Sequence, residues 1–465
     1  MFKFFSRYWS RFAVVTLAGE VLYLTAAVCL AIHIRFNRVS PEIFTEPLTW
    51  LRIVTFVTTI CIGMYLNDLF EFHVYPSIRG LGLGLMRALV FTAVGLWGIY
   101  YVIPALFLGR GVLAIAFILA IVPLALWRLF FLRTLANQLF PERIILVGTD
   151  SAALKIANEI LDRSHLGYQV LGFLDDDPEL QGVNVVNLGV IGVTADALEL
   201  ALEKQATRIV VAQQDHRGKL DLDALLSCKT QGIKVDRGAD FFERLTGQVS
   251  LDGPRVRSWL LFAEGFVVSR TQLLWKRILD LAVAICLLLL ALPILPLVAI
   301  AVRLGSRGPI LYRQERVGRQ GQVFTLWKFR SMDTEAETES GPRWADQDDP
   351  RVTWVGRVIR KARLDELPQL WNVLRGDMSL VGPRPERPEF VDQLRERNPL
   401  YDLRLAVRPG LTGWAQIRAS YAASFEESIE KLKYDLYYIK NLSVFLDLSI
   451  LASTIRIVLL RRGAQ

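Results

Sequence analysis

Cysteine and histidine are scarce in this 465-residue sequence, and their positions exclude several kinds of chemistry. The four cysteines, Cys29, Cys61, Cys228 and Cys286, form neither a CxxC pair nor a disulfide framework, which fits a reducing, cytosolic setting. The last of the four histidines is His216. A Ser-His-Asp triad, a phosphohistidine and a histidine-ligated zinc site are therefore excluded from the C-terminal third. If that third is catalytic, carboxylates and cations must carry the chemistry.

The first 269 residues also lack any excess of charge of one sign. Of the 54 basic and 46 acidic residues, 30 and 22 lie in 270–465, which leaves 24 of each in 1–269. The whole excess of +8 therefore belongs to the C-terminal segment. That segment should attract anions such as nucleotides, phosphates or lipid headgroups. We see no nucleic-acid recognition module, and we expect no nucleic-acid partner.

Long apolar runs dominate the first 140 residues, and the composition, at 52% hydrophobic, indicates a membrane protein. Four runs predict four transmembrane helices in a domain over 1–140: Phe12–Ile34, Leu51–Leu66, Ala88–Leu108 and Val112–Leu132. Basic residues before the first run and after the fourth place both ends in the cytoplasm. We expect no cleavable signal peptide, because Met1–Arg11 leads directly into the first run. Glu20 lies inside that run, and we interpret it as a contact between packed helices in preference to a functional residue.

A second domain over 141–245 alternates predicted strands and helices, which is typical of a doubly wound, Rossmann-like α/β unit. Arg143–Asp150 reads as a buried strand that precedes a helix, and a strand ending in Asp175–Asp177 follows. Only Gly148 stands where a dinucleotide-binding loop needs three glycines. We therefore interpret the domain as structural or regulatory, and the aspartates as a solvated loop, with a metal site as the alternative. Residues 246–270 are predicted to be a linker.

A fifth apolar run, Leu281–Val302, contains Pro293 and Pro296 past its middle. Basic residues flank it on both sides, which a single span cannot reconcile with the positive-inside rule. A re-entrant membrane helix near 277–303, broken at the prolines, resolves this conflict, because proline removes a backbone donor. An ordinary kinked span is the alternative. The last helical segment, near Tyr434–Leu460, fits either an amphipathic surface helix or packing against the core.

Two adjacent acids, Asp365 and Glu366, lie in an arginine-rich stretch that runs from Arg363 to Phe390. Leu367, Leu370, Trp371 and Leu374 follow at helical spacing, with Gly376 as the stop signal. One interpretation is a helix cap with surface salt bridges. The other is a carboxylate nucleophile beside a phosphate site, because an ionised carboxylate attacks phosphorus once the phosphate charge is neutralised.

Cations that could neutralise phosphate are plentiful around this acid pair, and arginine matches phosphate oxygens in bidentate fashion. The candidate phosphate-binding residues are Lys328, Arg330, Arg360, Arg363, Arg384 and Arg408. Each alone has the properties of a surface charge, but together they predict a polyphosphate pocket. Mg²⁺ is the expected cofactor, held by Asp365, Glu366 and substrate phosphates.

The motifs of the C-terminal third resemble the bacterial sugar transferases, also called monotopic phosphoglycosyl transferases. The matching stretches are KRILD (Lys276–Asp280), GPILYRQERVGRQGQVFTLWKFRSM (Gly308–Met332), RLDELPQLWNVLRGDMSLVGPRPE (Arg363–Glu386), RPGLTGWAQI (Arg408–Ile417) and KLKYDLYYIKNLS (Lys431–Ser443). Four spans and a Rossmann-like domain ahead of them are similar to the polyprenyl-phosphate hexose-1-phosphate transferase branch. The segment RSWLLFAEGFVVSR (Arg257–Arg270) resembles its exopolysaccharide-associated members.

This resemblance implies a mainly helical catalytic domain over 271–465 on the cytoplasmic face of the bacterial inner membrane. It implies transfer of a sugar-1-phosphate from a UDP-sugar to undecaprenyl phosphate, with release of UMP. Asp365 would attack the sugar-bearing phosphorus and form a covalent intermediate, and Glu366 would hold Mg²⁺ or manage a proton. The re-entrant helix would hold the site among membrane lipids, at the headgroup level. We also expect a homodimer.

Two rival interpretations come from other classes of protein. One is a non-catalytic scaffold for polysaccharide assembly that keeps a relic site, which the intact Asp365-Glu366 pair opposes. The other is a nucleotide-sugar oxidoreductase or epimerase that works through residues 141–240, which the missing glycines oppose. The sequence does not name the transferred sugar: glucose and galactose are both reasonable, and N-acetylated sugars stay open.

Overall fold

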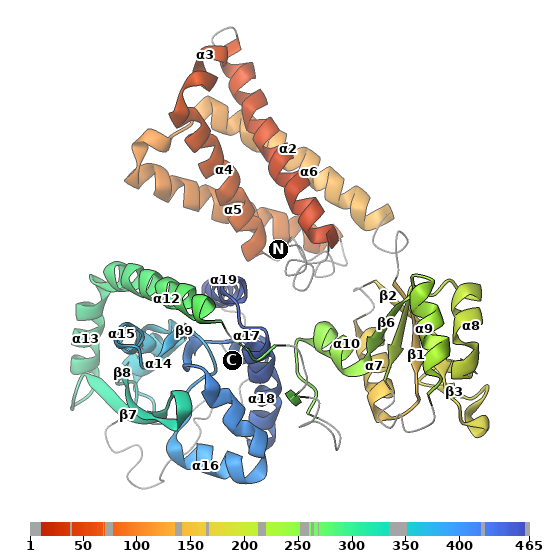
Figure 1. The fold of residues 1–465 in the computed structure, drawn as a ribbon. Coiled ribbons are helices and arrows are strands. Elements are labelled where there is room, and N and C mark those ends of the chain that lie inside the picture. The colour runs from red at the N-terminus through yellow and green to blue at the C-terminus, as the bar shows by residue number, and fades with distance from the viewer. Residues whose placement is uncertain are drawn as a thin grey trace. The chain divides into compact units, whose positions relative to one another are not determined.

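A computed structural model describes residues 11–37, 40–67, 69, 78–134, 142–163, 167–212, 220–251, 260–261, 265–267, 269–333, 351–419 and 424–460. The chain divides into two compact units, Met1–Phe241 and Phe242–Gln465 (Figure 1). The first unit contains the apolar helices and the α/β domain. The second unit contains the whole basic C-terminal segment.

The N-terminal helices confirm the four predicted apolar segments. Within the described residues, four helices are long and apolar enough to cross a membrane: α2 (Arg11–Phe36), α4 (Pro47–Leu66), α5 (Ile78–Val102) and α6 (Arg110–Thr134). The short helices α3 (Ser40–Thr45) and η3 (Pro104–Leu106) join them. Glu20 on α2 pairs with Arg128 on α6 at 2.7 Å, and both side chains are buried. This pair accounts for an acid inside an apolar run as a helix-to-helix contact.

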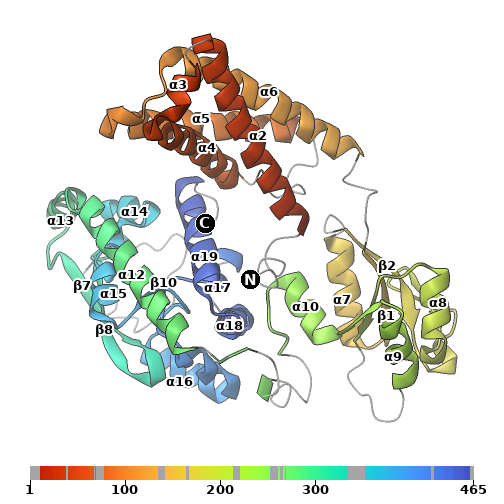
Figure 2. The same ribbon diagram turned by 45° about the horizontal axis from the view of Figure 1, so that its top comes forward.

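The α/β domain contains a six-stranded sheet with the strand order β3-β4-β2-β1-β5-β6. Its strands are β1 (Glu142–Val147), β2 (Tyr168–Leu174), β3 (Asn184–Val185), β4 (Leu188–Gly192), β5 (Arg208–Val211) and β6 (Lys234–Arg237). All neighbours pair in parallel except β3 and β4. Helix α7 (Ser151–Asp162) lies on one side of the sheet, and α8 (Ala197–Glu203) and α9 (Leu222–Thr230) on the other (Figures 1 and 2). The predicted doubly wound pattern is confirmed.

The C-terminal unit is mainly helical, as predicted, with two small sheets. The first pairs β7 (Leu311–Val317) with β8 (Val323–Phe329) in antiparallel fashion, and the second pairs β9 (Ser379–Val381) with β10 (Gly410–Thr412) in parallel. Its remaining described helices are α12 (Arg270–Ala291), α13 (Ile294–Gly305), η7 (Arg319–Gly321), α14 (Trp354–Lys361), η8 (Leu364–Glu366), α15 (Gln369–Arg375), α16 (Pro388–Arg397), η9 (Pro399–Ala406), α17 (Trp414–Arg418), α18 (Phe425–Lys440) and α19 (Val444–Leu460).

The fifth apolar run forms two helices, α12 and α13, whose axes differ by 63° across a short break. Pro293 lies at this break, and Pro296 lies in the first turn of α13. Backbone N–H groups in the first turn of a helix have no acceptor within that helix, so proline, which lacks an N–H, is tolerated there. Lys276 near the start of α12 is buried, and its Nζ donates to Asp447 of α19 (2.8 Å) and to the carbonyl of Val381 (2.9 Å). The bent pair is compatible with a broken span or with a re-entrant loop, by length and composition.

The flanking segments of this unit pack on its core. Helix α10 (Gly238–Thr246) ends inside the unit, where Glu243 accepts hydrogen bonds from Lys440 (2.5 Å) and Asn441 (3.1 Å). Farther along, Trp414 donates to the carbonyl of Gly247 (2.8 Å). At the other end, α19 buries Leu446 and Ile450 while Ile455 is exposed, so the core-packing alternative holds for its first half.

Candidate active site

The predicted acid pair lies on a tight helical turn between α14 and α15. Arg363 adopts the left-handed conformation (φ 56°), which is uncommon outside glycine, and this reverses the chain as it leaves α14. Asp365 and Glu366 then sit within η8, and only 8% of the Asp365 surface is exposed. Pro368, not an acid, precedes the first residue of α15, and no side chain caps that helix. The helix-cap interpretation of Asp365 is therefore wrong.

Glu366 is held by two cations that come from separate elements. Arg384, in the loop after β9, approaches Glu366 Oε1 at 2.7 Å, and Lys328 of β8 lies 3.6 Å from the same oxygen. Burial favours a raised pKa for Glu366, but Arg384 and Lys328 together hold that pKa well below its usual range. Burial lowers the pKa of Lys328 to about 8, against the opposing effect of Glu366. Glu366 is thus a fixed negative charge that orders two cations.

Asp365 has a different environment from its neighbour. Burial, and then repulsion from Glu366, raise the pKa of Asp365 to about 6, although Lys328, Arg360 and Arg384 oppose this. Its Oδ1 is buried and has no hydrogen-bond partner among the described residues. At neutral pH the group is mainly ionised, and its buried Oδ1 accepts no hydrogen bond from the part of the chain that the structure describes. Two adjacent acids with pKa values pushed in opposite directions are typical of a catalytic site.

The structure does not bring all six predicted cations to the acid pair. Arg360 is close enough to influence Asp365, and its Nε donates to Ser331 Oγ (2.8 Å). Arg363 is exposed but lowers the pKa of Glu366. Arg330 instead donates to the carbonyls of Ser306 (2.7 Å) and Arg307 (2.9 Å), so its guanidinium joins β8 to the segment after α13.

Arg408 belongs to a different basic neighbourhood. Burial lowers its pKa, and the positive charges of Arg277 and Arg319 lower it further, whereas Asp280 opposes them. Arg277 donates to the carbonyls of Val373 (2.7 Å) and Leu374 (2.9 Å) at the end of α15. The cations nearest the acids are therefore Lys328, Arg384, Arg360 and Arg363.

Two polar residues of α15 were missed from the sequence. Asn372 is fully buried and fixes α15 to β8, since it donates to Thr325 O (2.8 Å) and accepts from the Trp327 N–H (3.3 Å). Gln369 is 2% exposed, and its Nε2 has no partner within the described residues. The spacing Asp365, Gln369, Asn372 is the signal that could have found them, because it marks one face of a helix. The short helix predicted from the spacing of Leu367, Leu370, Trp371 and Leu374 is confirmed, although Trp371 is 58% exposed.

The predicted Mg²⁺ site can be tested against the donors present. Within the described part of the chain, no three His, Cys, Asp or Glu side chains are grouped to hold a metal ion. The unpartnered Oδ1 of Asp365, with Glu366 beside it, nevertheless supplies one or two carboxylate ligands. Mg²⁺ is commonly held by that number of carboxylates together with substrate phosphates and water. The residues fit a site that substrate completes, not a preformed cage.

Comparison with known protein families matches two regions of the chain. The model described as bacterial sugar transferase matches residues 271–461, and the model described as CoA-binding domain matches residues 66–219. The uncharacterized sugar transferase EpsL of Bacillus subtilis is 43% identical over 190 residues, which are 41% of this chain and 90% of that protein. The chain belongs to the bacterial sugar transferase family.

Longer relatives share more than the catalytic unit. An undecaprenyl-phosphate glucose phosphotransferase of Komagataeibacter xylinus is 34% identical over 344 residues, 70% of this chain and 60% of that protein. A UDP-N-acetylgalactosamine-undecaprenyl-phosphate N-acetylgalactosaminephosphotransferase of Aeromonas hydrophila is 41% identical over 241 residues, 52% of this chain and 56% of that protein. The chain spans a little over half the length of these two relatives.

The residues after β1 do not fit the phosphates of a bound coenzyme A. Asp150 Oδ1 accepts the Ala153 N–H (3.1 Å) at the start of α7, so a carboxylate occupies the position where a phosphate would bind. Thr149 donates to Asp175 Oδ2 (2.6 Å), which brings a second acid to the same strand ends. Asp176 and Asp177 likewise bond to nearby backbone N–H groups. We derive no cofactor chemistry from this domain.

Proposed function

We propose that this protein transfers a sugar-1-phosphate from a UDP-sugar to undecaprenyl phosphate and releases UMP. The observation that carries the proposal is a buried carboxylate, Asp365, whose Oδ1 has no hydrogen-bond partner among the described residues, beside a Glu366 already neutralised by Arg384 and Lys328. The names of the relatives from Komagataeibacter xylinus and Aeromonas hydrophila support it, since both describe sugar phosphotransfer to undecaprenyl phosphate. We further propose a role in exopolysaccharide repeat-unit synthesis, which rests on the resemblance of Arg257–Arg270 to exopolysaccharide-associated members of the family.

The reaction has two displacements at one phosphorus atom. In the first, Asp365 forms a bond to the phosphorus that bears the sugar, and the bond from that phosphorus to the UMP oxygen breaks. In the second, an oxygen of the lipid phosphate attacks the same phosphorus, and the Asp365 carboxylate leaves with its electron pair. No proton is needed on Asp365 in either step, so its ionised form is the active one. The leaving group is UMP, whose phosphate oxygen keeps the electron pair of the broken bond to phosphorus.

The basic residues stabilise the charge of this reaction. Lys328 and Arg384 are placed by Glu366 where they can also meet the donor phosphates, and Arg360 and Arg363 complete the cationic surround. When bound, Mg²⁺ would neutralise phosphate oxygens, and Asp365 and Glu366 are the residues that would hold it. Arg330 and Arg408 remain predicted phosphate ligands, although Arg330 already donates to backbone carbonyls.

The bent α12–α13 pair suits an enzyme with one soluble and one lipid substrate. We infer that it enters the bilayer from the cytoplasmic face of the bacterial inner membrane and returns to that face. The 63° bend and the basic residues on both sides of the apolar run Leu281–Val302, Lys276, Arg277, Arg303 and Arg307, support this inference. A polyprenyl phosphate stays in the membrane, so its headgroup must meet the site there. We further infer a homodimer, which a monomeric mass in native lipid nanodiscs would contradict.

The decisive experiment measures UMP release from a panel of UDP-sugars, with membranes that contain Mg²⁺ and undecaprenyl phosphate. Wild type should release UMP from one or more sugars only when the lipid is present. Asp365→Asn should lose at least about 1,000-fold in rate, because an amide oxygen is a poor nucleophile. Asp392→Asn, the same change at a 71% exposed aspartate of α16, is the matched control. Full activity in Asp365→Asn would revive the scaffold interpretation and remove Asp365 from the mechanism.

A further inference from the structure

The loop that carries Arg384 is fastened by its backbone. Four consecutive residues of this loop, 383–386, each use the carbonyl oxygen as a hydrogen-bond acceptor. The donors are the Gly410 N–H to Pro383 O (2.9 Å), Arg404 Nη2 to Arg384 O (2.8 Å), Arg316 Nη1 to Pro385 O (3.0 Å) and the Val317 N–H to Glu386 O (2.9 Å). The Arg384 side chain is thereby left to extend from a fixed backbone toward Glu366.

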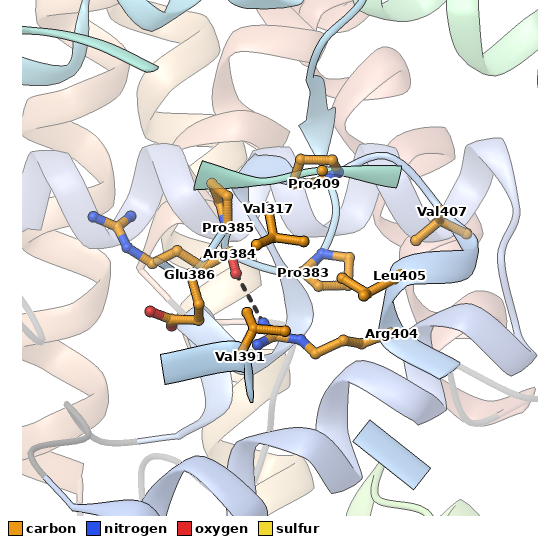
Figure 3. A pocket seen from close by; sticks show the side chains of 11 residues that line it. Val317, Pro383, Arg384, Pro385, Glu386, Val391, Arg404, Leu405, Val407 and Pro409 are labelled. Carbon is orange, nitrogen blue, oxygen red and sulfur yellow. Dashed lines mark hydrogen bonds between the residues drawn. The ribbon is translucent and has the colours of Figure 1, made fainter. Parts of the chain in front are cut away.

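Of these donors, Arg404 of η9 is the one that acts on Arg384 itself. Figure 3 shows its guanidinium below the loop, bonded to the Arg384 carbonyl, while the Arg384 side chain points away from the pocket. Proline on both sides of Arg384 restricts the backbone further, because the ring fixes φ. The pocket lies between this loop and the end of η9, with Val317, Leu405 and Val407 among its apolar walls.

Arg404 is in turn held by buried partners. Its Nη2 lies 3.0 Å from Asp435 Oδ2 of α18, and its Nη1 donates to the Tyr401 hydroxyl. Its guanidinium carbon is also 4.9 Å from the centroid of the Tyr401 ring. Arg404 and Asp435 are 8% and 3% exposed. One guanidinium group therefore joins α18, η9 and the loop.

A buried ion pair of this kind is weak grounds for stability. Removing two charges from water costs several kcal/mol per ion, and an apolar pair of similar size is often as stable or more so. Burial raises the pKa of Asp435 to about 6, and Glu386 adds to this rise, although Arg404 and Lys431 oppose it. The free-energy cost of desolvating the carboxylate therefore exceeds the stabilisation that its charged partners return. What an apolar pair cannot supply is the hydrogen bond to the Arg384 carbonyl.

We propose that Arg404, oriented by Asp435, is a positioning residue that fixes the Arg384 backbone so that the Arg384 guanidinium meets Glu366 and the donor phosphates. This inference rests on the proposed function. Arg404 acts through a carbonyl, so its loss should reduce transfer without removing a charge from the phosphate site. A merely structural role makes a different prediction, in which activity follows stability.

The test compares the double variant Arg404→Met/Asp435→Leu with wild type and with Arg404→Lys. We expect the double variant to keep a melting temperature within a few degrees of wild type, while kcat/KM for the UDP-sugar falls about 10- to 100-fold. Arg404→Lys keeps a positive charge beside Asp435 but loses the branched guanidinium group that contacts Asp435, Tyr401 and the Arg384 carbonyl together. This variant should therefore lose activity as well. The control Arg395→Met/Asp402→Leu removes the exposed pair between α16 and η9 and should leave kcat/KM unchanged.

Hydrogen exchange supplies a readout that does not depend on catalysis. The backbone amides bonded at this loop, Gly382, Gly410 and Val317, should exchange faster in the double variant and in Arg404→Lys, but not in Arg384→Gln, which keeps the backbone bonds and loses only the charge. A double variant with wild-type kcat/KM and wild-type exchange would overturn the inference. Should the double variant unfold, Arg404→Lys decides by the same two readouts. Wild type that releases no UMP would overturn the proposed function, and exchange would still decide whether Arg404 fixes the loop.

Discussion

At Asp365, burial and charge act in opposite directions on a single carboxylate. The neighbouring carboxylate, Glu366, has its pKa lowered because Arg384 hydrogen-bonds to it, whereas on Asp365 the nearby cations only partly offset the effect of burial. Sequence alone placed both acids in a basic neighbourhood, but it could not say which acid the arginine would bind. The structure shows that Arg384 Nη2 lies 2.7 Å from Glu366 Oε1, so Glu366 is the acid that the arginine binds.

Asp435 gives a pH dependence whose sign can be worked out. Its pKa is raised to about 6 in the folded protein, above the value of 3.8 for an exposed aspartate, so the folded state binds the proton more tightly. The stability that this proton contributes is present at low pH and is lost as pH rises through about 6. The melting temperature of wild type minus that of Asp435→Asn should therefore be larger at pH 5 than at pH 8.

The full linkage is on the order of 3 kcal/mol, because each pKa unit corresponds to about 1.4 kcal/mol. Asp392→Asn, at an exposed aspartate, should show the same difference from wild type at both pH values. A difference that stays constant for Asp435→Asn, or that shrinks on acidification, would show that the buried carboxylate does not take up a proton in this range.

At the scale of elements, helix α14 depends on a close approach to the strand segment that follows β8. A Cβ on Gly356 would lie 1.9 Å from the Ser331 carbonyl oxygen, a separation that no side chain tolerates. The same contact sets Arg360 one turn later against Ser331 Oγ. Helix propensity favours alanine over glycine, but here the steric conflict is the larger effect.

Gly356→Ala should therefore lower both the stability of the protein and its rate of UMP release. We expect a loss of about 1–3 kcal/mol, read as a lower melting temperature, because α14 must move and take Arg360 with it. Gly98→Ala on α5 is the matched control, since nothing lies within 4 Å of its added Cβ. Equal melting temperatures for the two variants would show that α14 can shift without cost.

The sequence was a good guide to elements and a poorer one to partners. Strands β1, β2 and β5 and the Gly376 helix stop follow from periodicity and turn chemistry, and the structure contains them as predicted. Spacing also brought Lys328 and Arg384 correctly to the acid pair. It could not reveal that Arg330 donates to backbone carbonyls, because an acceptor on the main chain leaves no trace in the residue types.

At the scale of the whole molecule, the C-terminal unit begins before the region that the family model matches. Residues 242–251 lie outside 271–461, yet Glu243 and Gly247 bond to α17 and α18. Glu243 and its partner Lys440 are 2% and 3% exposed, so this is a fully desolvated ion pair. The segment between the two regions that match family models is therefore not merely a spacer, because residues 242–251 pack in the core of the C-terminal unit.

Glu243→Gln should accordingly destabilise the C-terminal unit. Removing one member of a buried pair leaves the other charge without its carboxylate, at a cost on the order of 3 kcal/mol. Thermal unfolding of the detergent-solubilised protein would measure this as a clear drop in melting temperature. Glu430→Gln removes the 56% exposed partner of Lys433 and should cost less than about 1 kcal/mol. Similar melting temperatures for the two variants would mean that the 242–251 segment contributes little.

The four bonds that hold the loop at 383–386 all end on carbonyl oxygens, which every amino acid carries. The bonds that set the backbone shape of the loop therefore involve no side-chain atom of residue 384. Shape and charge are separate properties at this position: the main chain fixes where the side chain begins, and the arginine supplies the positive charge that buried Glu366 requires.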